Sequence, residues 1–281
     1  MKMIDVKNLT FQYQRKGKLV LDKLNFACEK GTVNVLIGLN GSGKTTLIKT
    51  IAGLLENYQG EVYIDGKSLK ELSIKQRAKI MAYVSQRSNA VDDFLVMDYL
   101  LFGTVNKMNF YQSPKEDDKN KALDCANQFR IEHLLDKKLG EISGGERQIV
   151  SICGAIVQDA DLIILDEPTS ALDIKNQHSV LSIIKKIAKE QGKTFILSSH
   201  NPNHALYLDS NVFLLKNGSI LAQGRAEDII NIETLKSVYG EEICYSTELA
   251  YREISFSDYE NKEALTHKDK LYSSILNAPK E

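Results

Sequence analysis

The sequence predicts an α/β fold, a core of buried strands and helices into which a helical segment is inserted. Short apolar runs at 33–37 and 162–165 have strand length and end at a glycine or at carboxylates, and longer segments between the strands show helical apolar spacing. Strand patterns then vanish from Arg87 to about Leu139. With 281 residues, the chain is long enough to bury a sizeable core as one large α/β domain or two lobes.

The first part of the chain supplies many of the expected strands. Residues 3–13 alternate roughly as a strand does, and Lys30-Gly31 separates the next two strands. Asp65-Gly66 is a turn signal that ends a strand begun at Gly60. We expect strands at 3–13, 20–29, 33–37, 60–64 and 80–85, with helices at 44–54 and 74–78.

Helical spacing dominates the middle of the chain, at 94–102, 121–135 and 149–158, and we expect a helical subdomain at about 87–158. Buried strands at 162–165 and 194–199 enclose a helix at 174–190. Asn217-Gly218 predicts a β-hairpin with arms 211–215 and 219–222. Short helices are expected at 226–231 and 232–238. The polar residues 246–281 are expected to form a tail after a domain at 1–245.

The strand at 33–37 leads into a loop with the spacing of a phosphate-binding loop. Its glycines allow successive N–H groups to point into one concavity, and the following helix adds a partial positive charge there. Lys44 supplies a charge to the outer phosphates, and the Thr45 hydroxyl can join a magnesium shell. A chance glycine-rich turn is the alternative, but the strand and helix on either side favour a nucleoside triphosphate site. The segment comprises Gly38, Leu39, Asn40, Gly41, Ser42, Gly43, Lys44, Thr45 and Thr46.

Two carboxylates end the buried strand at 162–165. Asp166 is placed to hold magnesium, and Glu167 can face the γ-phosphate and orient or deprotonate the attacking water. Adjacent acids at the end of an apolar strand are hard to explain as structure, because the strand end leaves them partly desolvated. We therefore assign both to the reaction.

Three further side chains are candidates whose local signal is weaker. Gln86 follows a predicted strand and could reach a metal ion or the γ-phosphate, although most such glutamines are solvated. His200 follows the strand at 194–199 and could sense the γ-phosphate, although a lone strand-end histidine is usually structural. Tyr13 could stack on a nucleotide base or be half-buried in a sheet.

A second candidate anion site lies at the start of the helix at 149–158. The residues Glu141-Ile-Ser-Gly-Gly-Glu place Ser143, Gly144 and Gly145 at the helix N-terminus, where backbone N–H groups are free to bind an anion. An ordinary Ser/Gly helix cap has the same appearance, so both interpretations stay open on local grounds.

Composition narrows the class of protein. The net charge of −1 gives no sign of nucleic-acid binding. The four cysteines have no CxxC spacing, which favours buried thiols in a reducing cytosol over a disulfide framework or a metal site. The N-terminal residues lack the apolar core of a secretory signal, and no stretch approaches the ~20 apolar residues of a membrane span.

Taken together, these motifs resemble the ATPase subunits of ABC transporters over about residues 3–240. GLNGSGKTT, Gln86, ISGGE, LIILDEP, SALD and His200 occur in the order and approximate spacing of that family. ISGGE downstream of a phosphate loop is the most specific of them. The resemblance implies the P-loop NTPase fold of ABC ATPases, with a RecA-like core, an antiparallel β subdomain and an inserted helical subdomain.

The resemblance also implies roles for the candidate residues. Glu167 would be the catalytic base, with His200, Lys44 and Gln86 as further catalytic residues, and Thr45, Gln86 and Asp166 would hold Mg²⁺. ATP would lie between two copies of the chain, each contributing half of the site. One copy would contribute Tyr13, Gly38, Asn40, Gly41, Ser42, Gly43, Lys44, Thr45 and Thr46, and its partner Ser143, Gly144, Gly145, Glu146 and Asp173.

A transporter ATPase would act as a homodimer at the cytoplasmic face of the inner membrane, on a permease dimer that receives cargo from a substrate-binding protein. DIKNQ (173–177) and HNPNHA (200–205) look like the patterns of importers for metal chelates, namely ferric siderophores, haem and cobalamin. Departures from the family pattern are small: Ile142, Glu146 and Asn201 stand where leucine, glutamine and aspartate are usual. Asn201 could soften the coupling between His200 and the Ser170–Asp173 segment.

Three alternatives remain at this stage. A non-transport ABC ATPase acting on nucleic acid or ribosomes is disfavoured by the single core and by the lack of a basic surplus. An ATPase of iron–sulphur or cofactor assembly, and an exporter subunit, are disfavoured by the metal-chelate patterns.

Overall fold

A computed structural model describes residues 1–14, 17–86, 92–105 and 113–240. All of them belong to one compact unit, Met1–Ile243. The predicted tail at 246–281 lies outside the described residues. No helix in the described ranges is long and apolar enough to cross a membrane.

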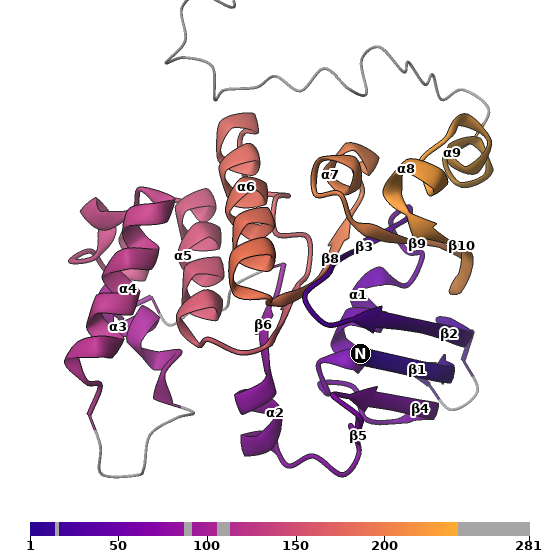
Figure 1. Cartoon of the computed structure of the whole chain (residues 1–281), viewed down its shortest axis with the longest axis horizontal. Helices are drawn as coiled ribbons and strands as arrows, with labels where there is room; N and C mark the ends of the chain where they lie inside the picture. Colours follow the sequence, from indigo (N-terminus) through magenta and orange to yellow (C-terminus); the bar gives the residue numbers. More distant parts are fainter. Residues whose placement is uncertain (15–16, 87–91, 106–112, 241–281) are drawn as a thin grey trace, which may run out of the picture. The chain divides into compact units, whose positions relative to one another are not determined.

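One of the two sheets is antiparallel and has the strand order β2-β1-β4-β5 (Figure 1). Its central strand β1 pairs with both neighbours, so that Ile4 lies opposite Cys28 on one side and Ile64 on the other. Apolar residues on one face of this sheet are buried, because strand side chains alternate between faces. The strands are β1 (Lys2–Phe11), β2 (Leu21–Glu29), β4 (Tyr58–Ile64) and β5 (Lys67–Ser68).

The other sheet is mainly parallel and has the order β10-β9-β3-β8-β7-β6. Its inner strands are buried along their whole length, as strands covered on both faces are. The predicted hairpin is present and adds β10 antiparallel to β9. The carboxyl ends of β3, β7 and β8 meet at one edge, where ligands bind in open α/β sheets. The strands are β3 (Val33–Ile37), β6 (Met81–Val84), β7 (Leu162–Leu165), β8 (Thr194–Ser199), β9 (Asn211–Lys216) and β10 (Ser219–Arg225).

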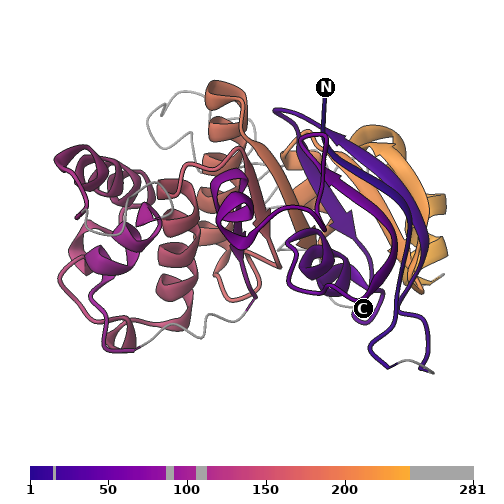
Figure 2. The same ribbon diagram turned by 90° about the horizontal axis from the view of Figure 1, so that it is seen from below.

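Helix α1 (Lys44–Ile51) lies between the two sheets (Figures 1 and 2). Leu47, Ile48 and Ile51 are fully buried and belong to a core that includes residues of both sheets, such as Ile4 and Ile196. The phosphate loop that precedes α1 is therefore fixed to a rigid centre.

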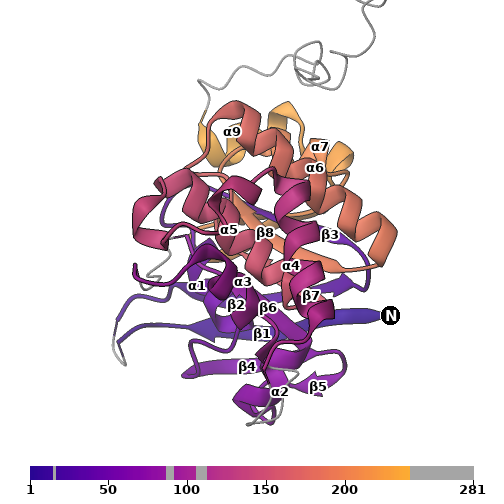
Figure 3. The same ribbon diagram turned by 90° about the vertical axis from the view of Figure 1, so that its left-hand side faces the viewer.

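The middle of the chain is helical, as predicted. Helices α3 (Val96–Phe102) and α4 (Glu116–Phe129) both contact α5 (Gly144–Val157), and α4 also contacts α6 (Ile174–Gln191) (Figure 3). Helix α4 begins five residues before the predicted start at Lys121, because its first turn is acidic and exposed and so carries no apolar spacing. Two short 3₁₀ helices follow α4, at Glu132–Leu134 and Leu139–Glu141.

Helices α2, α6, α8 and α9 follow the predicted order, whereas α7 (Pro202–Tyr207) was not predicted. α6 begins at Ile174, where the Asp173 side chain caps it by accepting the N–H of Asn176 at 2.8 Å. The other bounds are α2 (Ile74–Ile80), α6 (Ile174–Gln191), α7 (Pro202–Tyr207), α8 (Ala226–Ile229) and α9 (Ile232–Tyr239).

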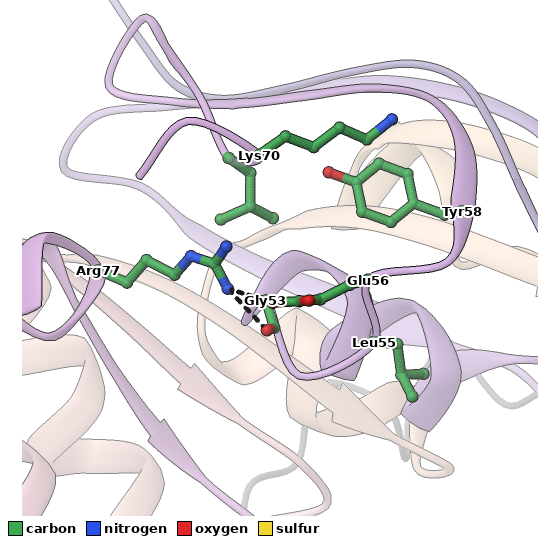
Figure 4. A pocket seen from close by; sticks show the side chains of 7 residues that line it. Gly53, Leu55, Glu56, Tyr58, Lys70 and Arg77 are labelled. Atoms are coloured by element: carbon green, nitrogen blue, oxygen red, sulfur yellow. Dashed lines mark hydrogen bonds and ion pairs between the residues drawn. The ribbon is translucent and has the colours of Figure 1, made fainter. Parts of the chain in front are cut away.

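Arg77 of α2 links this helix to the turn that follows α1 (Figure 4). Its Nη1 donates to the carbonyl oxygen of Gly53 at 2.9 Å, and its Nε donates to that of Leu72 at 2.9 Å. Gly53 has φ 72° and lies so close that an added Cβ would be 2.6 Å from Nη1. The guanidinium lines a pocket together with Tyr58 and Lys70. These bonds tie the segment before β6, and hence before Gln86, to the core.

The described cysteines, Cys28, Cys125 and Cys153, are buried free thiols, as expected. Burial raises the pKa of Cys28 and Cys153 well above the usual thiol range, so both are held as neutral thiols.

Candidate functional site

The phosphate loop joins β3 to α1 and requires glycine at two positions for different reasons. Gly43 caps α1 with φ 107°, a conformation that L-residues rarely adopt. At Gly38 an added Cβ would lie 2.4 Å from the carbonyl oxygen of Leu215, so the backbone there approaches β9 too closely for any side chain. Leu39, Asn40 and Gly41 at the tip of the loop are exposed.

Two buried polar groups of this loop suit an anionic ligand. Ser42 is 6% exposed, and within the described residues its hydroxyl has no hydrogen-bond partner. Lys44 is 4% exposed, and its Nζ donates to the carbonyl oxygens of Gly38 (2.8 Å) and Leu39 (3.2 Å). Burial lowers the pKa of the Lys44 ammonium, while the carboxylates of Glu167 and Asp166 act in the opposite direction. A buried cation beside an unsatisfied hydroxyl fits a polyphosphate.

Asp166 and Glu167 follow β7, which is separated from β3 by β8 in the sheet, and their side chains reach Thr45 and Lys44 of the phosphate loop. Asp166 is 1% exposed, and its Oδ1 accepts hydrogen bonds from Thr45 Oγ1 at 3.1 Å and Ser198 Oγ at 2.8 Å. Its backbone N–H donates to the carbonyl oxygen of Val84 in β6 at 2.9 Å. A hydroxyl beside a buried carboxylate is a pair of oxygen donors of the kind that Mg²⁺ prefers.

Glu167 connects three parts of the site. Its Oε2 accepts a hydrogen bond from Gln86 Nε2 at 2.8 Å, and its Oε1 lies 3.9 Å from Lys44 Nζ. Glu167 has φ 48°, in the left-handed region that non-glycine residues seldom occupy. Strained backbone of this kind is concentrated at functional sites.

Tyr13 lies beside the first turn of α1. Its hydroxyl and Thr46 Oγ1 are 3.1 Å apart, and its ring packs edge-on against Phe11 with centroids 5.0 Å apart. The side chain is 61% exposed, so most of the ring is free to meet a ligand near the loop.

His200 follows β8 and is exposed. Its backbone carbonyl is bound by a residue of α9, near the end of the described chain. Tyr239 of α9 donates its hydroxyl hydrogen to the carbonyl oxygen of His200 at 3.1 Å. Behind it, the buried His204 of α7 pairs its Nδ1 with Ser199 Oγ at 3.0 Å. The Asn201 side chain caps α7 by accepting the N–H of Asn203 at 3.0 Å.

The second predicted anion site is built as a helix cap. Ser143 Oγ accepts the N–H of Glu146 at 3.2 Å, and the N–H of Ser143 donates to Glu146 Oε2 at 2.8 Å. These bonds with Ser143 lower the pKa of Glu146. Gly145 lies against the Ser170–Asp173 segment, where an added Cβ would be 3.2 Å from the carbonyl oxygen of Ala171. In the described ranges, no hydrogen bond or ion pair joins Ser143–Glu146 or Asp173 to the phosphate loop of the same chain.

Comparison with known proteins decides the family. Residues 21–170 match the family described as ABC transporter. The chain belongs to the ABC transporter family. An uncharacterized ABC transporter ATP-binding protein of Haemophilus influenzae is 37% identical over 237 residues, which are 84% of this ABC chain and 89% of that protein. The petrobactin import ATP-binding protein of Bacillus subtilis is 32% identical over 84% of this chain and 92% of its own length.

Solved structures agree with the family. A chain from a structure described as an inward-facing conformation of a metal-chelate type ABC transporter is 30% identical, with a TM-score of 0.73 over 85% of this chain and 89% of that chain. A dimeric ATP-binding cassette in a post-hydrolysis state, bound to ADP and Pi, is 26% identical, with a TM-score of 0.72 over 80% of this chain and 99% of that chain. This ABC chain is thus an ATP-binding, ATP-hydrolysing cassette.

Sequence reasoning missed three residues that shape the site of this ABC ATPase: Ser198, His204 and Tyr239. Ser198 carries a weak signal, because it lies near the end of the predicted strand at 194–199, two residues before His200. Tyr239 had no signal, since it contacts His200 from a distant part of the chain.

His204 should make the ABC ATPase less stable in acid. Burial and the nearby His200 lower the pKa of His204 from 6.5 to about 4 in the folded chain. Between pH 6.5 and 4 the unfolded imidazole binds a proton that the folded one does not, so the free energy of unfolding falls as pH decreases. We expect a loss of about 3 kcal/mol over this range, measured by urea unfolding. His204→Gln should remove most of that slope, whereas His133→Gln, at an exposed position, should keep it.

Proposed function

We propose that this chain is the ATP-binding subunit of an importer for metal chelates, such as ferric siderophores, haem or cobalamin. It would couple ATP binding and hydrolysis to uptake through a separate permease. The observation that carries the ATPase half of the proposal is the convergence of Lys44, Thr45, Gln86, Asp166 and Glu167 at one sheet edge.

Each residue has a distinct task in this proposal. Lys44, with the N–H groups of the loop, would stabilise negative charge on the phosphates, and Glu167 would accept a proton from the attacking water. Gln86 would orient Glu167 through the 2.8 Å hydrogen bond, and His200 would contact the γ-phosphate. Mg²⁺, when bound by Thr45, Asp166 and Gln86, would neutralise charge on the phosphate oxygens.

The two halves of the proposed ATP site come from two copies of the chain. Ser143, Gly144, Gly145 and Glu146 would face the phosphate loop of the partner, together with Asp173. Among the described residues, no hydrogen bond or ion pair joins these residues to the phosphate loop of their own chain. A similar cassette bound to ADP and Pi is dimeric. Both observations support this arrangement. Such an interface is isologous, so ATP would be enclosed twice across one two-fold axis. Bound ATP would then shift the population towards the closed dimer.

The cargo class is proposed from the relatives and from two sequence patterns. A relative named for petrobactin import and a structural neighbour of the metal-chelate type support it. The DIKNQ segment starts α6, and the HNPNHA segment begins with His200 and includes the first four residues of α7. We propose that the chain works as a homodimer bound peripherally to a permease dimer at the cytoplasmic face of the inner membrane. That permease would receive its cargo from a substrate-binding protein, and the transporter would not act on nucleic acid.

A pull-down from detergent-solubilised membranes tests the transporter assignment. Tagged Glu167→Gln protein, produced in its native host, should recover a many-span permease with and without ATP, because the permease contacts lie outside the ATP site. The untagged chain gives the background. Recovery of soluble partners alone would contradict the transporter proposal and favour an assembly ATPase, and recovery of an exporter permease would contradict import.

A further inference from the structure

Ser198 bridges the two carboxylate residues of the ATP site. It is fully buried in β8, and its hydroxyl donates to Asp166 Oδ1 at 2.8 Å and accepts the backbone N–H of Glu167 at 2.8 Å. The pairing of Leu165 with Leu197 in the parallel sheet brings this hydroxyl to the end of β7. One side chain thus contacts both residues at once.

The bond to Glu167 fixes a backbone that would otherwise relax. Glu167 has φ 48°, a left-handed conformation that carries an energetic cost for a non-glycine residue. The Ser198 hydroxyl is the partner of its N–H, so the hydrogen bond offsets that cost and sets the direction of the side chain. From this position the carboxylate reaches Gln86 Nε2 at 2.8 Å and lies 3.9 Å from Lys44 Nζ.

The bond to Asp166 fixes the rotation of its carboxylate. Ser198 Oγ and Thr45 Oγ1 both donate to the same oxygen, Oδ1. Two donors on Oδ1 hold the plane of the group, and the Ser198 donor remains in place if the Thr45 hydroxyl turns towards a metal ion. A carboxylate held by a second residue is a better-defined metal ligand than a free one.

We propose that Ser198 is a positioning residue for ATP hydrolysis, which sets the geometry of the general base Glu167 and of the metal ligand Asp166 through one hydroxyl. The inference rests on the proposed roles of these two acids. It does not depend on the cargo or on the permease.

The test compares the full-length chain with Ser198→Ala, Ser198→Cys and Ser198→Thr. Loss of a hydrogen bond to a charged group, together with loss of the anchor of Glu167, should lower kcat about 10-fold to 100-fold in Ser198→Ala, with little change in KM for ATP. Ser198→Cys keeps the size but is a weak donor and acceptor, so it should show the same loss to a smaller degree. Ser198→Thr retains the hydroxyl and should recover most of the activity.

A second readout separates positioning from general packing. Mn²⁺ binding to the chain loaded with a non-hydrolysable ATP analogue, followed by electron paramagnetic resonance, should weaken about 10-fold in Ser198→Ala and recover in Ser198→Thr. Ser210→Ala is the matched control: Ser210 is equally buried, and its hydroxyl donates to the carbonyl oxygen of Ala205 at 3.1 Å. It should change the thermal midpoint without changing Mn²⁺ affinity or kcat.

Two results would overturn the inference. One is unchanged Mn²⁺ affinity and kcat in a folded Ser198→Ala or Ser198→Cys chain. The other is a loss of activity that matches a loss of stability and that Ser198→Thr does not reverse. If Glu167→Gln abolishes turnover while Ser198→Ala does not change it, the proposed site stands and the role of Ser198 fails. If Glu167→Gln leaves turnover intact, the proposed site itself fails.

Discussion

Glu167→Gln should stop ATP hydrolysis while leaving ATP bound. Glutamine matches the size of glutamate and can still accept the hydrogen bond from Gln86 Nε2, which is 2.8 Å away in the native chain. It cannot accept a proton from the attacking water, so we expect kcat to fall ~10²–10⁴-fold with KM for ATP nearly unchanged. Phosphate release by the full-length chain at saturating MgATP measures the effect.

The same variant should make the proposed dimer visible. Because ATP is retained and not hydrolysed, the contacts that it makes with Ser143–Gly145 of the second copy persist, and the closed dimer accumulates. Size-exclusion chromatography with light scattering should give a dimer in the presence of ATP and a monomer in its absence. This outcome depends on the two-fold site proposed above.

Glu190→Gln is the matched control, because Glu190 is exposed near the end of α6. It should behave as the native chain in both measurements. Native turnover in Glu167→Gln would exclude Glu167 as the base. If Glu167→Gln loses turnover but stays a monomer at every ATP concentration, the assignment of Glu167 as the general base stands. The proposal that two copies of the chain share the ATP site is then contradicted.

The sequence predicts those parts of the fold and site that are local in the chain. β8 is predicted to the residue, because Thr194–Ser199 is buried throughout and polar residues bound it. The phosphate loop is likewise a continuous segment whose strand, turn and helix signals agree. α4 is predicted too late because its first residues, Glu116 to Asp118, are all acidic and none is buried, so apolar periodicity could not reveal them.

Features that depend on sheet register were beyond sequence reasoning. Ser198 and Asp166 are 32 residues apart, and the pairing of β7 with β8 alone brings them within 2.8 Å. Contacts outside the sheets were equally beyond sequence reasoning: the Tyr239 hydroxyl of helix α9 reaches the carbonyl oxygen of His200 across 39 residues. Gln86, by contrast, is a candidate site residue from the sequence, because it follows a predicted strand. Its hydrogen-bond partner, Glu167, could not be predicted, because the two residues lie in segments that are far apart in the chain.

Lys44→Met should abolish ATP binding without weakening the fold. Lys44 is 4% exposed, and burial lowers the pKa of its ammonium by disfavouring the charged form, although the carboxylates of Glu167 and Asp166 act in the opposite direction. Its present partners are two backbone carbonyls, of Gly38 and Leu39, and the Glu167 carboxylate at 3.9 Å, which keeps its bond from Gln86. Methionine fills similar space without a charge, so we expect the free energy of unfolding to stay level or rise, as measured by urea denaturation.

ATP binding should respond in the opposite direction, and that contrast makes the experiment decisive. Charge-assisted hydrogen bonds are worth about 1.5–3 kcal/mol each, so loss of two to the phosphates should weaken ATP binding ~10²-fold or more by calorimetry. Lys49→Met, on the same helix and partly buried, should bind ATP normally. If Lys44→Met loses stability and ATP affinity to the same extent, Lys44 stabilises the folded loop. If the variant is stable but no longer binds ATP, the buried cation destabilises the fold and its role is to bind the phosphates.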